Sequence, residues 1–113
     1  MAKYLISFPA AAMIASGADL EAAGRESRAV IEHARAAGVY VFGGGLDASV
    51  PVVRVSAEGA VTLGGYAAGP ALDGGFAVLE LPSREAAIEW AARIAKACRC
   101  DQELRVFMFD PAS

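Results

Sequence analysis

Few side chains in this 113-residue sequence have types suited to chemistry at neutral pH, and they are widely spaced. The single histidine, His33, is a type that often serves as a general base. No neighbour in the sequence is placed to orient it, and it falls near the end of a predicted helix, where the helix dipole favours histidine. We therefore interpret His33 as a structural helix-end residue, and the sequence assigns no catalytic residue.

The two cysteines form a Cys98-x-Cys100 pair. Zinc needs four ligands, three of them from the protein even in catalytic sites, and the sequence offers only two thiols and one imidazole. A disulfide between residues so close in the chain would be strained. We expect two reduced thiols at a helix end, no metal and no cofactor.

A run of three glycines, Gly43 to Gly45, follows a predicted strand. A phosphate-binding loop needs its glycines to lead into a helix N-terminus, whereas these lead to Asp47, Pro51 and another strand. The run therefore predicts a bulge or bend where two backbone segments approach closely.

The elements that must position these residues begin with a strand over 3–8, bounded by Pro9. Segment 10–18 is compatible with a loop or a short helical turn. A helix follows, with Asp19 as its N-cap and Gly38 as its C′ residue. Its apolar stripe recurs at spacings of three and four and comprises Leu20, Ala23, Ser27, Val30, Ile31, Ala34 and Ala37.

The second half of the chain predicts mostly strands. A second helix begins at the N-cap Ser83 and turns Ala87, Trp90, Ala91 and Ile94 inward. A strand is predicted over 39–42. The strands 50–55 and 60–63 are predicted to form a hairpin through a turn at Glu58-Gly59. A loop over 64–75 precedes a strand over 76–81, and the last predicted strand covers 103–109.

The resulting order, β-α-β-β-β-β-α-β, predicts one α+β domain over residues 1–113. We expect a ferredoxin-like sandwich of the dimeric α/β-barrel kind, with an extra inner β-hairpin and two helices on one face of an antiparallel sheet. The other sheet face also carries apolar side chains, notably Phe107 and Phe109. An uncovered apolar face is best explained by packing on a partner's sheet, so we predict a two-fold homodimer.

Composition excludes several classes of function. The net charge is -3 and the basic residues are dispersed, which argues against nucleic-acid binding. No apolar run is long enough to span a bilayer. Segment 1–9 is interpreted as a first strand and not as a leader, because Pro9 interrupts it and Asp19 and Glu21 follow soon after. The expected compartment is the cytoplasm.

The sequence resembles the YCII-related, or DGPF-domain, family over nearly its whole length. The similarity rests on the order and spacing of several short runs. These are 36–39, Gly43-Gly44-Gly45-Leu46, Val53-Arg54-Val55, Gly59, Gly74-Gly75-Phe76, Ser83, 85–86, 88–94 and 103–106. The resemblance implies a bacterial dimeric α/β-barrel protein. Most members have no established role, some occur beside or fused to sigma factors, and a few wider relatives act on hydroxylated aromatic compounds.

The chain departs from the family where the Asp-Gly-Pro-Phe run is expected. Leu63-Gly64-Gly65-Tyr66 replaces it, and Ala68 and Pro70 fall where a Glu and a Lys are common. The early histidine of a branch with a His-Asp pair is also missing.

The resemblance suggests a ligand-binding site at Tyr66, Asp73 and Arg105, judged by where these residues fall relative to the family's motifs. Tyrosine would donate a hydrogen bond, aspartate would act as a base and arginine would anchor an anionic substrate. The competing interpretation is a packed aromatic ring, a solvated turn acid and an edge-strand arginine.

Three functions follow from these patterns. The first is a homodimer that binds a small molecule. The second is an enzyme acting on a small anionic or aromatic substrate in a cleft of the dimer. The third is a protein-interaction module in transcription-related regulation.

Overall fold

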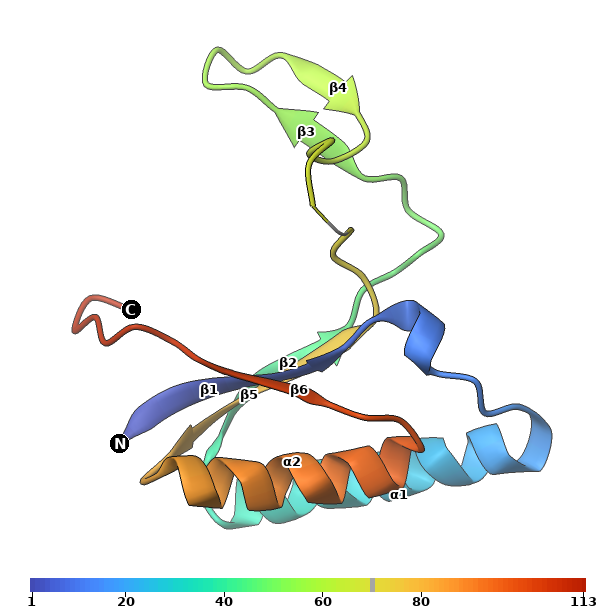
Figure 1. The fold of residues 1–113 in the computed structure, drawn as a ribbon, viewed down its shortest axis with the longest axis vertical. Helices are drawn as coiled ribbons and strands as arrows, with labels where there is room; N and C mark the ends of the chain where they lie inside the picture. The colour runs from blue at the N-terminus through green and yellow to red at the C-terminus, as the bar shows by residue number, and fades with distance from the viewer. Residues whose placement is uncertain (70) are drawn as a thin grey trace.

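Two helices lie on one face of a four-stranded antiparallel sheet, and a separate β-hairpin stands on the other side (Figure 1). The computed structural model describes residues 1–69 and 71–113; Pro70, in the predicted loop over 64–75, lies outside the described residues. The elements are β1 (Ala2–Phe8), the one-turn 3-10 helix η1 (Ala10–Ala12), α1 (Gly17–Ala36), β2 (Tyr40–Gly45), β3 (Val53–Val55), β4 (Val61–Leu63), β5 (Gly75–Leu81), α2 (Arg84–Cys98) and β6 (Glu103–Val106).

The main sheet has the strand order β2-β5-β1-β6, and every neighbouring pair is antiparallel. The α+β class, the element order and the placing of both helices on one sheet face are confirmed. Leaving β3 and β4 aside, the order β1-α1-β2-β5-α2-β6 with this sheet is compatible with the ferredoxin-like fold.

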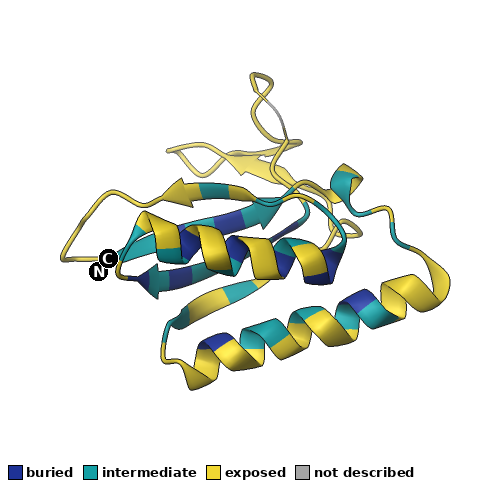
Figure 2. Cartoon of the chain, turned by 60° about the horizontal axis from the view of Figure 1, so that its bottom comes forward, coloured by how far each residue is buried: buried dark blue, intermediate teal, exposed yellow. Residues whose placement is uncertain are grey.

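The core lies between the sheet and the helices. Alternate residues of β5, including Leu79 and Leu81, point to the helices and are buried, as is Ile6 of β1. Each such side chain contributes about 1.5–3 kcal/mol by leaving water. The helices meet the sheet through small residues, among them Ala34 and Ala87, so they approach it closely. Figure 2 shows the buried residues gathered between the two layers and the hairpin exposed throughout.

Helix ends were partly predictable. The Ser83 hydroxyl accepts a 3.1 Å hydrogen bond from the Ala86 amide, and Gly38 has φ +74° just past α1, so both predicted caps are confirmed. The prediction of Asp19 as N-cap is wrong. α1 begins at Gly17 after Ser16, whose carbonyl accepts from the Leu20 amide, and Asp19 lies in the first turn.

The glycine run belongs to β2, so the predicted end of that strand at 42 is wrong. The register shifts between Tyr40 and Phe42, which marks an irregularity in the pairing with β5. A Cβ atom on Gly43 would lie 2.7 Å from the Phe76 carbonyl oxygen. The expected close backbone approach is confirmed at Gly43, whereas the irregularity lies just before the glycine run, which pairs regularly with β5.

The last strand is shorter than predicted. β6 ends at Val106 and not at 109. The Phe107 amide still donates to the Lys3 carbonyl, but Met108 and Phe109 are almost fully exposed. Segment 10–18, left open by the sequence, contains η1 followed by an irregular stretch into α1.

The predicted hairpin forms, but as a two-stranded sheet of its own. Val53 pairs with Leu63 and Val55 with Val61, and the connecting turn passes through Gly59 with φ +86°. Figure 1 shows the hairpin standing apart from the main sheet, and no described strand of that sheet pairs with β3 or β4. Within the described residues, neither α1 nor α2 has the length and apolar character needed to cross a membrane.

Candidate functional site

A cavity of about 520 Å³ lies between the sheet and the helices. Its size is typical of small-molecule sites. The sheet contributes residues from β1, β2 and the start of β5: Ile6, Phe8, Tyr40, Gly43 to Gly45 and Gly74 to Ala77. The helices and the segments beside them contribute the rest of the lining: Ala10, Met13, Ser27, Ile31, Ile94, Cys98 and Gln102. Every layer of the main fold therefore contributes to one hollow.

The cavity wall is largely apolar. Among the described residues that line it, none is an acid, a base or a histidine. The polar side chains are those of Ser27, Tyr40 and Gln102, together with the Cys98 thiol. Such a wall favours ligands with a large apolar surface and few hydrogen-bonding groups.

Glycines keep one side of the cavity open. Gly74 has φ +83°, and a Cβ atom there would lie 2.8 Å from the Ala10 amide nitrogen and 2.9 Å from the Pro9 carbonyl carbon. A Cβ on Gly75 would lie 3.1 Å from the Phe8 ring. Only glycine lets η1 and the end of β1 pass this close to the start of β5, so these positions shape the wall without supplying functional groups.

Tyr40 is the best-placed polar group of the wall. Its ring is covered by the Arg35 guanidinium, 4.9 Å from the ring centre, a favourable cation–π arrangement. Its hydroxyl lies beside Gly43, 3.0 Å from where a Cβ would be. The ring is therefore held from outside, and its hydroxyl is available to orient a ligand.

The two cysteines are free thiols, and they stand at and just after the end of α2. Burial raises the pKa of Cys98, and the neighbouring Cys100 adds to the rise. Burial also raises the pKa of Cys100, whose sulfur lies 3.5 Å from the side-chain nitrogen Nε2 of Gln102. Because the thiolate is the nucleophile, both groups are poorly reactive at neutral pH.

The structure does not bring Tyr66, Asp73 and Arg105 together around this cavity, and none of the three lines it. Tyr66 follows β4 and is 86% exposed. Arg105 lies on the edge strand β6 and pairs with Glu103 at 3.3 Å. Such an exposed pair contributes little to stability.

Asp73 acts on the cavity indirectly. Its carboxylate accepts a 2.9 Å hydrogen bond from the Ala10 amide. Ala10 lines the cavity, and so does Gly74, the residue next to Asp73. Asp73 thus fixes η1 against the start of β5 and holds the wall in place.

His33 has a partner that the sequence did not reveal. Its Nδ1 lies 2.7 Å from Arg93 Nη2, and the Arg93 guanidinium also covers the Trp90 ring at 4.1 Å. A guanidinium only donates, so Nδ1 accepts this bond. His33 is exposed and lies outside the cavity lining. The contact joins α1 to α2, which is a structural role.

The residues that sequence reasoning missed are mostly the cavity's aliphatic and glycine lining. Gly43 to Gly45 and Gly74-Gly75 are brought side by side by the pairing of β2 with β5. The run of three glycines in β2 and the glycine pair at the start of β5 were the available signal, and it indicates space and not chemistry. Within residues 1–69 and 71–113, no three His, Cys, Asp or Glu side chains are grouped so as to hold a metal ion.

Neither a comparison with models of protein families nor a search of curated proteins finds a match to this chain.

Proposed function

We propose that this chain is a small-molecule-binding protein whose ligand occupies the cavity between the sheet and the helices. The observation that carries the proposal is a hollow of about 520 Å³ with an apolar wall and a few polar groups from several elements. Tyr40, Ser27 and Gln102 are suited to orient a ligand by hydrogen bonds, while the aliphatic lining supplies most of the binding free energy.

The ligand class follows from the charges of the wall. An unpaired buried carboxylate or ammonium costs several kcal/mol or more, whereas burial of a neutral ring is favourable. The described lining offers no cation for an anion and no carboxylate for a cation. A neutral, mainly apolar molecule with one or two hydroxyl or carbonyl groups therefore fits better than an anionic one.

A binding role is also better supported than catalysis. The titratable groups of the described lining are the Tyr40 phenol and the Cys98 thiol. Burial raises the pKa of Cys98 and so suppresses the thiolate that covalent catalysis needs.

The proposal includes a homodimer of the YCII-related kind. Phe42 and Phe76 lie on the sheet face away from the helices, with ring centres 6.1 Å apart, and Val78 and Phe107 share that face. The same face carries the Lys3–Glu80 and Arg105–Glu103 ion pairs. Its exposed aromatic residues, with Phe42 61% and Phe107 47% exposed, support burial against a second subunit. The family assignment rests on the sequence resemblance, and the free thiols support a reducing compartment such as the cytoplasm.

A thermal-shift titration tests the ligand site. 2-Naphthol and 2-naphthoate share one ring system, but only the second is anionic at neutral pH. We expect naphthol to raise the unfolding temperature and naphthoate to have little effect, since only a ligand bound to the native state stabilises it.

Two variants locate the binding. Ile31→Trp places an indole in the cavity from α1 and should abolish the naphthol shift. Leu20→Trp adds the same ring on the same helix at an exposed position outside the lining and should preserve it. A naphthol shift that survives Ile31→Trp, or no shift with neutral aromatic probes, would overturn the proposal.

A further inference from the structure

Most of the segment between β2 and β5, described over residues 46–69 and 71–72, forms a projecting arm. The Leu46 amide donates a 2.7 Å hydrogen bond to the Gly74 carbonyl, so the two ends of the arm are held together at its base. Beyond this bond the chain leaves the main sheet and carries the β3-β4 hairpin (Figure 1).

One face of the hairpin is entirely apolar. The paired residues Val53 and Leu63, and Val55 and Val61, point to the same side. All four are exposed, Val61 by 66% and Leu63 by 78%. These four side chains are called the valine face below.

The opposite face of the hairpin carries Arg54 and Thr62, and Arg54 makes a contact within the arm. Arg54, which points away from the valine face, donates a 2.9 Å hydrogen bond to the Gly65 carbonyl. The Gly64 amide donates to the Val52 carbonyl at 2.7 Å. The first bond ties Gly65 to the Arg54 side of the hairpin, and the second continues the β3-β4 pairing by one residue. The four side chains of the valine face stay 48% to 78% exposed.

The whole chain exposes more surface than a compact monomer of its mass. Its accessible surface is 7886 Å², against about 5,800 Å² for a folded monomer of 11.6 kDa. Its radius of gyration is 15.8 Å, against about 13 Å for a globular chain of this length. The excess of about 2,000 Å² exceeds the roughly 800 Å² per partner of a standard interface and reaches the range of obligate dimers.

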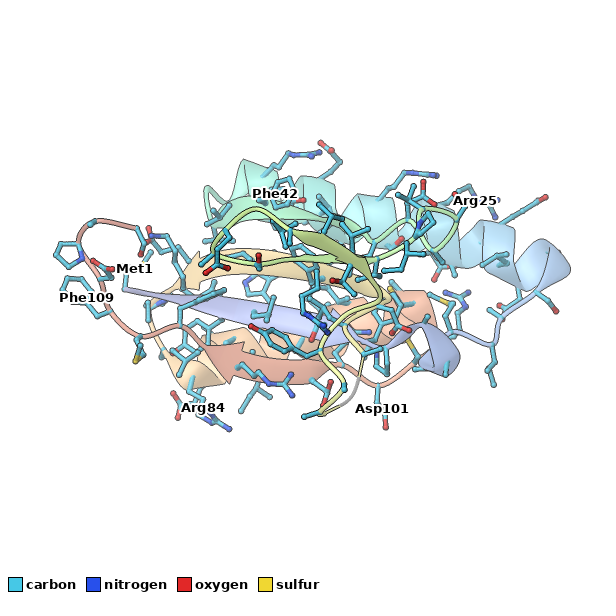
Figure 3. The ribbon with its side chains drawn as sticks, turned by 90° about the horizontal axis from the view of Figure 1, so that it is seen from above. Met1, Arg25, Phe42, Arg84, Asp101 and Phe109 are labelled. Carbon is cyan, nitrogen blue, oxygen red and sulfur yellow. The ribbon has the colours of Figure 1, made fainter. Side chains whose placement is uncertain are left out.

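Many of the exposed large apolar side chains lie on the arm and on the sheet face from which it rises, among them Val61, Leu63 and Phe42. Figure 3 looks down on that face, with the arm toward the viewer and Phe42 near it. A hollow of about 360 Å³ on the same face is lined by apolar residues that include Val41, Val78 and Phe107, and by the charged Lys3, Glu80 and Asp110. The arm itself carries charge only at Asp47, Arg54 and Glu58.

We propose that a second copy of this chain sits on the open sheet face and is clasped by the arm, with the valine face buried against it. This inference rests on the proposed homodimer and adds the arm to its interface. In a two-fold dimer both copies bury the same two surfaces, here the valine face and the open sheet face, so both apolar areas are removed from water together. A lone two-stranded hairpin is marginally stable in water, so the partner also accounts for the stability of the arm.

Adjacent positions on β4 give a matched test. Val61→Asp places a charge on the valine face, and Thr62→Asp places the same charge on the opposite face of the same strand. Phe42→Asp disrupts the sheet face itself. Light scattering and sedimentation from micromolar to millimolar concentration measure the dissociation constant of each, with circular dichroism as the check of folding.

We expect the wild type at twice the chain mass of 11.6 kDa. Val61→Asp and Phe42→Asp should each raise the dissociation constant about 100-fold or more, because an unpaired charge is buried. Thr62→Asp should stay within about threefold of the wild type. Amide exchange in 53–63 should slow as the wild type is concentrated, a readout that needs no variant.

The outcomes separate the arm from the rest of the proposal. A dimer that is lost in Phe42→Asp but unchanged in Val61→Asp overturns the clasp and leaves the sheet-face dimer standing. Equal effects of Val61→Asp and Thr62→Asp also overturn it. A monomeric wild type overturns the dimer and the clasp together, while the naphthol shift reports on the ligand cavity independently.

Discussion

The guanidinium of Arg99 forms two parallel hydrogen bonds of 3.0 Å with the carboxylate of Glu26, and so joins the end of α2 to α1. Arg99 also donates from Nε to Asp19 at 3.0 Å and to the Ala97 carbonyl at 2.6 Å. It is the C-cap of α2 and takes the left-handed conformation, with φ 58°. One side chain thus fixes the relative position of the two helices that cover the cavity.

The Arg99–Glu26 pair predicts a pH-dependent stability. The hydrogen bond from Arg99 lowers the pKa of Glu26, so the stabilisation is complete above the unfolded-state pKa and is lost as pH falls through the lower folded-state pKa. Glu26→Gln should therefore unfold at lower urea concentration than the wild type at pH 7. The difference should shrink as pH falls below the ordinary pKa of a glutamate, about 4.3, vanish below the lower folded-state pKa, and also shrink in high salt. A difference that grows on acidification would contradict this account.

Gly74 should tolerate no side chain. Gly74→Ala combines a left-handed φ of +83° with overlap against Phe8, Pro9 and Ala10. We expect a loss of about 3–5 kcal/mol in urea unfolding followed by Trp90 fluorescence. Gly38→Ala is the control, since Gly38 has φ +74° but nothing within 4 Å of its Cβ position. It should cost only about 1–2 kcal/mol, and equal losses at the two sites would show that the close approach is unimportant.

Asp73 should act through the wall of the cavity and not through chemistry. Asp73→Ala removes the acceptor of the Ala10 amide and should lower stability by about 1 kcal/mol and weaken naphthol binding several-fold. Asp73→Asn keeps an oxygen acceptor and should remain close to the wild type in both measurements. If the asparagine variant loses binding as completely as the alanine variant, the negative charge itself is required.

The cavity should protect Cys98 from alkylation. Because burial raises the pKa of both thiols, iodoacetamide should label them more slowly at neutral pH than it labels a free cysteine. Cys98 lines the cavity, whereas Cys100 does not. Peptide mass spectrometry should show that bound naphthol slows labelling at Cys98 more than at Cys100. Equal protection of the two would place the ligand elsewhere.

Local signals in the sequence predicted most of the fold. Ser83 caps α2 through its own hydroxyl, and Gly38 ends α1 through its own φ, so each signal acts within a few residues of where it is read. The N-cap prediction for Asp19 was wrong because an aspartate before an apolar stripe is typical of an N-cap. In the structure its carboxylate instead accepts a hydrogen bond from Arg99, 80 residues away.

The cavity was beyond local signals. Its wall combines Met13, Gly44 and Cys98, which share no pattern and meet only through the sheet pairing and helix packing. The same holds for the Asp73–Ala10 bond, which spans 63 residues. Family position directed attention to Tyr66, but the exposure of that ring follows from the departure of the hairpin from the main sheet, which no turn or strand propensity encodes.

The closed base of the arm makes residues 47–72 replaceable as a unit, with Asp73 kept because it holds the Ala10 amide. Because the bond between Leu46 and Gly74 holds the two ends together, insertions, deletions or a transplanted hairpin in this stretch leave the helices, the sheet and the ligand cavity with unchanged anchor points. Duplicated copies of such a chain are free to diverge in which subunits they accept while keeping the same interior.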